Sequence, residues 1–409
     1  MIRLRVAFLL ILLFALQSVF AQTEEPTEEP ASETTSDETP FRVIGYFTSW
    51  SIYDTQYFVT DVEASLLTHI NYAFANISAD GEVVLGDPWA DVEIPLADEP
   101  EDAPLKGNFH QLQLLKEQYP HLQTLISVGG WTWSGRFSDV ALTAESREKF
   151  AKSARDFMIE YGFDGVDLDW EYPTGGGNVG NTERPEDLEN FVLLLEAVRA
   201  ELDAQGEADG RHYLLTIAAG AGKSAYEPLD WDRIHPVLDF INVMTYDMSG
   251  GWSEVSGLSA PLYDSSADPV EGMSTDSVMQ AFLGLGIPSD KIVLGVPFYG
   301  HSWNGVSDEN NGLYQPFKQA DAINYDYRLL TTGGYLDTMT RFWHDEAQVP
   351  WLYTDANDGL IISYEDPTSI KLKAQYARDN GLGGVMFWEL SDDSEDSALL
   401  RAIHATDEK

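Results

Sequence analysis

Eight short apolar runs recur along the sequence, and they constrain the fold more than any other feature. They are rich in Val, Ile, Phe and Tyr, and several are nearly continuous in hydrophobicity, as expected of parallel strands covered on their outer face. We predict a β-strand at each of these runs: residues 42–48, 69–74, 122–128, 165–170, 213–219, 240–246, 292–298 and 384–388.

Apolar residues at helical spacing fill the intervals between these strands. One set follows Thr143, which suits a helix N-cap: Phe150, Ala154, Phe157 and Tyr161. A second set follows Pro185, near a helix start: Leu188, Phe191, Leu195, Val198 and Leu202. Eight strand and helix units predict a (β/α)₈ TIM barrel, with a doubly wound open sheet as the alternative.

The connection between the seventh and eighth strands is too long for one helix. It spans roughly 80 residues, whereas connections in such folds are short. We therefore expect a subdomain inserted between strand 7 and strand 8, at about residues 303–355.

The N-terminal segment predicts export. Residues 1–21 hold Arg3 and Arg5, an apolar run over residues 6–16 and small residues ending at Ala21, the layout of a cleavable signal peptide. An uncleaved membrane anchor is the alternative, although a spanning helix needs about 20 apolar residues. We expect a secreted, extracellular protein without membrane attachment after cleavage.

Composition limits the partners and the disulfide chemistry. Residues 22–40 hold seven acids, three prolines and no basic residue, which predicts a disordered linker before the folded region, residues 41–409. The formal charge is −44; the leader contributes +2 and the linker −7, so residues 41–409 carry −39. This charge excludes nucleic acid as a natural partner and suits solubility or salty surroundings. Without cysteine, neither disulfides nor thiolate metal sites are available.

The segment Asp-Gly-Val-Asp-Leu-Asp-Trp-Glu-Tyr-Pro at residues 164–173 is the most informative for chemistry. Asp167, Asp169 and Glu171 alternate with apolar residues, so a strand would place the three carboxylates on one face. In a barrel that face points inward, and Glu171 falls at the carboxyl end where active sites form. Like charges on a buried face are costly, so one of these acids should hold a proton near neutral pH and be able to act as a general acid.

A solvated edge strand and a divalent-metal site are the two alternatives to this interpretation. A solvated edge strand with a chance run of acids conflicts with the apolar residues interleaved on the other face. A divalent-metal site is the more serious alternative, because three carboxylates can hold Mg²⁺ or Mn²⁺. Against it, no His or further carboxylate stands at ligand spacing within the segment, and Trp170 and Tyr172 flank the acids.

The same segment resembles the DxxDxDxE motif of family 18 glycoside hydrolases, the chitinase family. Other segments match that family in the same order: Gly45-Tyr46, Ser127-Val-Gly-Gly130 before Trp131, Met244-Thr-Tyr-Asp247, Pro297-Phe-Tyr-Gly300 and Val385-Met-Phe-Trp388. The match covers about residues 41–402, and the insertion resembles the α+β subdomain of bacterial-type chitinases.

The resemblance implies substrate-assisted hydrolysis with retention, an exception to the scheme with two catalytic carboxylates. Glu171 would protonate the leaving oxygen, and Asp169 would orient the substrate's acetamido group. Asp167 and Ser127 would tune the charge of Asp169, while Tyr246 would hold the acetamido oxygen.

The resemblance also implies a set of sugar-binding residues. Trp388 would form the floor under the cleaved sugar, with Trp131 stacking at the next one, although each can instead be a core residue. Asp247 would lie beside the sugar and Tyr46 would support the carboxylates. Gly130 and Met244 would belong to the same site, and Met244 would pack below it rather than contact the sugar directly.

One position departs from the family pattern. His301 stands where the family often has Arg, and because His loses its charge near neutral pH, we expect this contact and the pH profile to differ.

We therefore predict a secreted chitinase that hydrolyses β-1,4 bonds between N-acetylglucosamine units. Its partner would be chitin or N-acetylglucosamine oligosaccharides, with no cofactor and no metal, and we expect a monomer. The alternatives are a catalytically inactive chitin-binding lectin, an endo-N-acetylglucosaminidase acting on glycoproteins, or a peptidoglycan hydrolase.

Overall fold

The computed structural model describes residues 40–96, 105–321, 323 and 325–405. The predicted signal peptide and residues 22–39 of the predicted linker lie outside these ranges. Across the described residues, we find no helix with the length and apolar character needed to cross a bilayer.

Eight parallel strands close into a barrel. Their order is β1-β15-β8-β7-β6-β5-β4-β2, and β1 pairs with β2 as well as with β15, so the sheet has no open edge. The closure confirms the predicted (β/α)₈ barrel and excludes the open doubly wound sheet. The strands are β1 Arg42–Thr48, β2 His69–Ile77, β4 Gln123–Gly129, β5 Gly165–Asp169, β6 Leu214–Gly220, β7 Phe240–Met244, β8 Ile292–Pro297 and β15 Gly384–Trp388; the short β3 (Val83–Val84) pairs with the end of β2.

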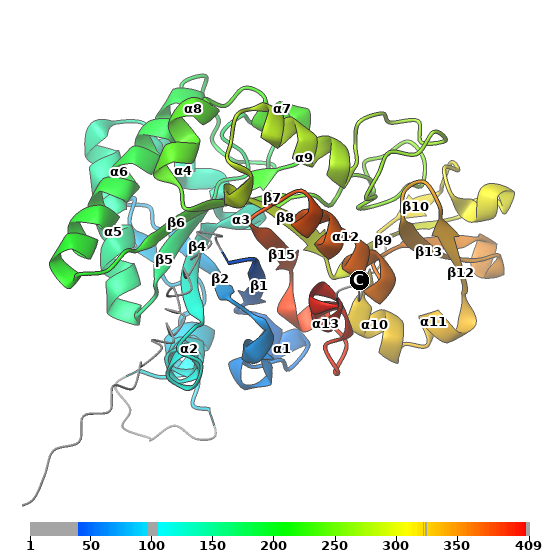
Figure 1. Ribbon diagram of the computed structural model, residues 1–409, viewed down its shortest axis with the longest axis horizontal. Helices are drawn as coiled ribbons and strands as arrows, with labels where there is room; N and C mark the ends of the chain where they lie inside the picture. The colour runs from blue at the N-terminus through cyan, green and yellow to red at the C-terminus, as the bar shows by residue number, and fades with distance from the viewer. Residues whose placement is uncertain (1–39, 97–104, 322, 324, 406–409) are drawn as a thin grey trace, which may run out of the picture. The chain divides into compact units, whose positions relative to one another are not determined.

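Helices surround the barrel (Figure 1). The helix α5 (Ala144–Tyr161) begins as predicted, because the Thr143 hydroxyl accepts a hydrogen bond from the Ser146 N–H, and it ends at Gly162 with φ of 76°. The helix predicted after Pro185 is α6 (Asp187–Asp209). The remaining barrel helices are α1 Ser51–Asp54, α2 Gly107–Gln118, α3 Gly130–Trp133, α4 Phe137–Ala141, α7 Lys223–Tyr226, α8 Trp231–Ile234, α9 Thr275–Gly284, α12 Pro367–Asp379 and α13 Ala398–His404.

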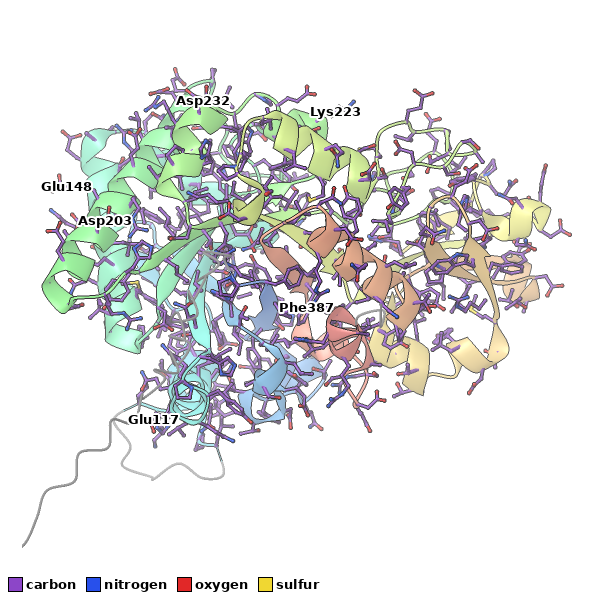
Figure 2. All side chains as sticks on the ribbon, in the orientation of Figure 1. Glu117, Glu148, Asp203, Lys223, Asp232 and Phe387 are labelled. Carbon is purple, nitrogen blue, oxygen red and sulfur yellow. The ribbon has the colours of Figure 1, made fainter. Side chains whose placement is uncertain are left out.

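Alternation along the strands separates an outer core from the barrel interior. In β1, Val43 and Phe47 pack in the large outer cluster beneath the helices, whereas Ile44 and Tyr46 belong to a smaller inner cluster. Figure 2 shows Phe387 of β15 in the middle of the molecule and acidic side chains on the outer helices: Glu117, Glu148, Asp203 and Asp232. The period of two therefore decides which side chains reach the interior.

A second, antiparallel sheet lies between β8 and β15 in the chain. Its strands are β9 Tyr299–Asn304, β10 Gln319–Ala320, β11 Tyr325–Asp326, β12 Thr340–His344, β13 Val349–Thr354 and β14 Leu360–Ser363, with the helices α10 Tyr327–Thr332 and α11 Tyr335–Thr338. The sheet extends beyond the expected range 303–355 at both ends, because β9 pairs with β14 and places His301 opposite Ser363. Its core contains the fully buried Trp303.

Candidate active site

The predicted acidic series lies at the C-terminal end of β5. Asp167 and Asp169 belong to the strand, and Glu171 follows two residues beyond its end. All three side chains are buried, with Glu171 8% exposed. The residues that alternate with them pack in the outer core: Val166, Leu168 and Trp170. Because side chains alternate along a strand, the three carboxylates share the opposite, inner side.

Asp167 accepts hydrogen bonds from residues on four other strands. The hydroxyls of Tyr46 and Ser127 donate to Oδ2, each at 2.8 Å. Thr216 donates to Oδ1 at 2.5 Å, and the Asn242 amide donates to the same oxygen at 3.4 Å. Burial raises the pKa of Asp167 and these hydrogen bonds oppose that rise, which leaves a net upward shift. The four donors hold this carboxylate in one orientation.

The surroundings of Asp169 and Glu171 favour the protonated form of each side chain. Burial raises the pKa of Asp169 well above its ordinary value, and the charges of Glu171 and Asp167 add to this. Burial also raises the pKa of Glu171 to about 7; a hydrogen bond from Tyr172 opposes that shift, and the Asp247 charge adds to it. Among the described residues, Oδ1 of Asp169 has no hydrogen-bond partner although it is buried. It is therefore available to a group brought by a ligand.

The backbone around Glu171 is held by two side chains that sequence analysis missed. The Ser134 hydroxyl accepts a hydrogen bond from the Glu171 N–H at 2.8 Å. It also lies 2.8 Å from the carbonyl oxygen of Gly130 and 3.0 Å from that of Asp169, either of which can receive its proton. Asn181 donates to the Glu171 carbonyl oxygen at 3.1 Å. Ser134 begins a short 3₁₀ helix, Ser134–Arg136, and Asn181 lies in a loop, so no periodic pattern marks either residue.

Thr216 and Asn242 were also missed, but here the sequence offers a signal. Each is a polar residue inside a strand that is otherwise apolar, Leu-Leu-Thr-Ile-Ala-Ala-Gly in β6 and Phe-Ile-Asn-Val-Met in β7. Both side chains are fully buried. A buried polar residue needs a hydrogen-bond partner, so these positions point to the barrel interior.

Aromatic rings surround Trp388 at the end of β15. The Phe74 ring is stacked on it with centroids 5.7 Å apart, and Tyr46 lies at 5.4 Å. Trp50 lies at 6.2 Å and is 38% exposed. Trp388 itself is half-buried, so part of its surface is open to a ligand, as a sugar-binding floor requires.

The turn after β4 brings Gly130 against the Phe74 ring, and Trp131 follows it in the chain. Gly130 has a φ of +75°, and a Cβ atom at this position would lie 2.6 Å from the Phe74 ring. The close approach therefore requires glycine. Trp131 is 50% exposed, which leaves its ring available for stacking.

Tyr246 follows β7 on the inner side of the barrel. Burial raises the pKa of its hydroxyl well above 10, and the charges of Asp247, Asp169 and Glu171 add to the shift. The hydroxyl therefore keeps its proton and can act as a hydrogen-bond donor. Met244 is partly buried and packs against the inner apolar cluster, as predicted for packing below the site.

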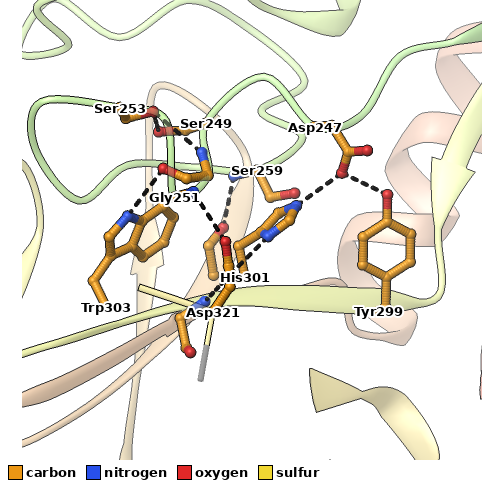
Figure 3. A network of polar contacts seen from close by, with 12 residues as sticks. Asp247, Ser249, Gly251, Ser253, Ser259, Tyr299, His301, Trp303 and Asp321 are labelled. Carbon is orange, nitrogen blue, oxygen red and sulfur yellow. Dashed lines mark hydrogen bonds and ion pairs between the residues drawn. The ribbon is translucent and has the colours of Figure 1, made fainter. Parts of the chain in front are cut away.

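Asp247 is bound by two side chains from β9 (Figure 3). The Tyr299 hydroxyl donates to its Oδ1 at 2.5 Å, and Nε2 of His301 lies 2.8 Å from the same oxygen. Nδ1 of His301 lies 2.9 Å from Oδ1 of Asp321, a residue that sequence analysis missed. Figure 3 shows the imidazole between the two carboxylates.

The expectation that His301 loses its charge near neutral pH is wrong. Burial lowers its proton affinity, but the hydrogen bonds and charges of Asp247 and Asp321 outweigh that effect and raise the pKa of His301 to about 9. His301 thus carries a positive charge at neutral pH, as an arginine would. Asp321 contributes to this effect from a position 20 residues away in the sequence.

The site as a whole can donate and accept protons around a bound ligand. Glu171 is half protonated at about pH 7, Asp169 has an unpartnered oxygen within the described site, and Tyr246 is a donor. Within the described ranges, no group of three or more His, Cys, Asp or Glu side chains has a metal-binding arrangement.

Comparisons with known proteins agree with this geometry. The model of the glycosyl hydrolases family 18 matches residues 42–393. Chitinase A1 of Niallia circulans is 43% identical over 86% of this chain, which spans only 56% of that protein. Chitinase 1 of Aphanocladium album is 38% identical over 88% of this chain and 84% of its own length.

A solved structure gives the same result. Chitinase ChiA74 from Bacillus thuringiensis superposes with a TM-score of 0.83 at 40% identity, covering 89% of this chain and 70% of that one. Because the family model spans most of the chain and the sequence identities exceed 30% over most of it, the protein belongs to family 18 of the glycosyl hydrolases.

Proposed function

We propose that this chain is a chitinase that hydrolyses β-1,4 bonds between N-acetylglucosamine units with retention of configuration. The observation that carries the proposal is the position of Glu171, a carboxyl with a pKa of about 7 at the mouth of the barrel. Relatives named as chitinases support chitin or its oligosaccharides as the substrate.

The proposed chemistry begins with proton transfer from Glu171 to the glycosidic oxygen. The carbonyl oxygen of the substrate's own acetamido group attacks the anomeric carbon as the glycosidic bond breaks, which forms an oxazolinium ion. Asp169 accepts a hydrogen bond from the acetamido N–H through its unpartnered oxygen and thereby orients the attacking carbonyl group. Glu171, now ionised, takes a proton from the water that opens the ring, and this step restores both the acid and the original configuration.

The surrounding residues support this sequence of steps. The four hydrogen bonds to Asp167 keep a fixed carboxyl below Asp169. We expect the Tyr246 hydroxyl, which keeps its proton, to donate to the acetamido oxygen, and the half-buried ring of Trp388 to offer an apolar surface to the sugar face. Preorganised donors and charges of this kind act on the transition state without further reorganisation.

The test is hydrolysis of fluorogenic N-acetylglucosamine dimers and trimers by the purified chain. We expect release of the fluorophore, with the β-anomer as the first product in proton NMR, and no effect of EDTA. Release of the α-anomer first would contradict retention, and inhibition by EDTA reversed by Mg²⁺ would favour the metal alternative. Oligosaccharide binding without release would indicate the lectin, and neither binding nor release would indicate another N-acetylated glycan.

We also propose that the protein is exported, on the strength of Arg3, Arg5 and the apolar run that follows them. Mass spectrometry of protein recovered from culture medium tests this directly. An N-terminus at Gln22 is expected, whereas retention of residues 1–21 in the cell fraction would contradict it.

A further inference from the structure

Asp321 connects three parts of the polypeptide near the site. Its Oδ1 lies 2.9 Å from Nδ1 of His301 and accepts a hydrogen bond from the Ser302 N–H at 3.2 Å. Its Oδ2 accepts a hydrogen bond from the Gly251 N–H at 2.9 Å, in the loop that follows β7. One carboxylate thus holds β9 together with the loop after β7, which contains Asp247.

The geometry around His301 specifies its charge. Both ring nitrogens face carboxylate oxygens, and a carboxylate can only accept a hydrogen bond. A neutral imidazole has one N–H and would turn a lone pair toward one of the two carboxylates. Only the imidazolium, with two N–H groups, satisfies both contacts.

The elements packed around His301 add no other charge. Tyr299 and Trp303 of its own strand lie with ring centroids at 5.7 and 6.5 Å, and Trp252 from the loop after β7 lies at 5.5 Å. On the β14 side His301 is paired with Ser363. Among the described residues in contact with His301, the charged groups are therefore Asp247 and Asp321.

Asp247 links the charge of His301 to the pKa of the proton donor, Glu171. The residue has a φ of +56°, a left-handed conformation that is unfavourable for Asp and that the bonds from Tyr299 and His301 help to hold. Its negative charge raises the pKa of Glu171. A cation on Asp247 offsets that charge, so the state of His301 affects Glu171.

We propose that Asp321 is a positioning residue of the active site, which keeps His301 cationic and bridged to Asp247 and thereby sets the charge that Glu171 experiences. It touches no reacting atom and acts through His301. The effect on catalysis rests on the proposed hydrolase function, whereas the bridge itself does not.

The first test is an NMR titration of the His301 imidazole in the wild type and in Asp321→Asn, with the signal assigned by its loss in His301→Arg. Removing one of two carboxylate partners should lower the midpoint by about 2 pH units or more, from about 9 to about 7 or below, so that His301 loses its charge in the range where Glu171 titrates. The exposed Asp355 provides the matched control, since Asp355→Asn removes one acid from the same subdomain and should leave the titration unchanged. An unchanged midpoint in Asp321→Asn would overturn the proposal.

The second test is the pH profile of kcat/KM in four proteins: the wild type, Asp321→Asn, His301→Arg and the double variant. With His301 present, loss of Asp321 should move the basic limb to higher pH, because Asp247 loses its counter-charge and raises the pKa of Glu171 further. With Arg at position 301, the same change should leave the limb in place, since arginine keeps its charge.

A merely structural role for Asp321 gives a different pattern. Loosening the loop at Gly251 would lower kcat/KM by the same factor at every pH and in both backgrounds, and this result would overturn the proposal. If the wild type hydrolyses none of the substrates, the proposed function fails, and the NMR titration alone decides whether Asp321 controls the charge of His301.

Discussion

The Tyr46 hydroxyl donates a hydrogen bond to Oδ2 of Asp167 at 2.8 Å, which joins β1 to β5 across the barrel interior. Both side chains are buried almost completely. Sites 121 residues apart in the chain therefore meet inside the active site. The bond links the stability of the barrel to the orientation of its carboxylates.

We predict that Tyr46→Phe lowers the free energy of unfolding by about 1–3 kcal/mol, the cost of leaving a buried acceptor with one donor fewer. Urea denaturation measures this change. Tyr53→Phe is the matched control, because that ring is 47% exposed although its hydroxyl also donates to an aspartate, Asp87, at 2.8 Å. We expect a change of at most about 0.5 kcal/mol in the control, and equal effects of the two substitutions would contradict the account.

The pH dependence of catalysis should follow Glu171. A general acid must be protonated in the free enzyme, and the pKa of Glu171 is about 7, so kcat/KM should fall as the pH rises through that value. The measurement is a pH profile with the fluorogenic dimer. A plateau that extends past pH 9 would exclude Glu171 as the proton donor.

The same pKa has a consequence for stability. The pKa of Glu171 rises from 4.5 in the unfolded chain to about 7 in the folded protein. This difference stabilises the folded protein at pH values below 4.5, and the stabilisation is lost as the pH rises through 7. Glu171→Gln removes the ionisation, so the variant should be more stable than the wild type at pH 8, by up to about 3 kcal/mol. The two proteins should differ less at pH 4. Denaturation at both pH values tests this, and a variant that is less stable at pH 8 would contradict it.

Sequence analysis located the eight strands of the barrel and the acidic series because both depend on local periodicity. In β5, Val166 and Leu168 pack in the outer core. Because side chains alternate along a strand, Asp167 between them must lie on the inner side, and this can be predicted without knowing any tertiary contact. Boundaries differed by a few residues, as in β2, which continues to Ile77.

The contacts that control His301 could not be predicted in this way. Asp321 lies after the short strand β10, where two residues give no period, and it reaches His301 only through the antiparallel pairing of β10 with β9. The charge of an imidazole depends on such neighbours. The residue type at position 301 therefore led to the wrong charge, while its position in the motif was informative.

The two tryptophans predicted to bind sugars, Trp388 and Trp131, should affect substrates of different length unequally. Trp388 stacks on Phe74 and is predicted to lie under the cleaved sugar, so Trp388→Ala should raise KM for the fluorogenic dimer by about tenfold or more, equivalent to about 1.4 kcal/mol or more. Trp131 is 50% exposed and is predicted to contact the next sugar. Its replacement by Ala should affect longer oligosaccharides more than the dimer. Steady-state kinetics with dimer, trimer and longer chains measure both effects, and an equal loss for all lengths in Trp131→Ala would contradict that assignment.

The most direct test of the central claim compares Glu171→Gln with the wild type in both hydrolysis and binding. Glu117→Gln is the matched control, because Glu117 is an exposed residue on the outer helix α2 (Figure 2). We predict that Glu171→Gln loses about 10²-fold or more in kcat, because it lacks the proton donor, while oligosaccharide affinity stays nearly intact and Glu117→Gln behaves as the wild type. Full activity of Glu171→Gln would contradict the assignment of Glu171 as the catalytic acid.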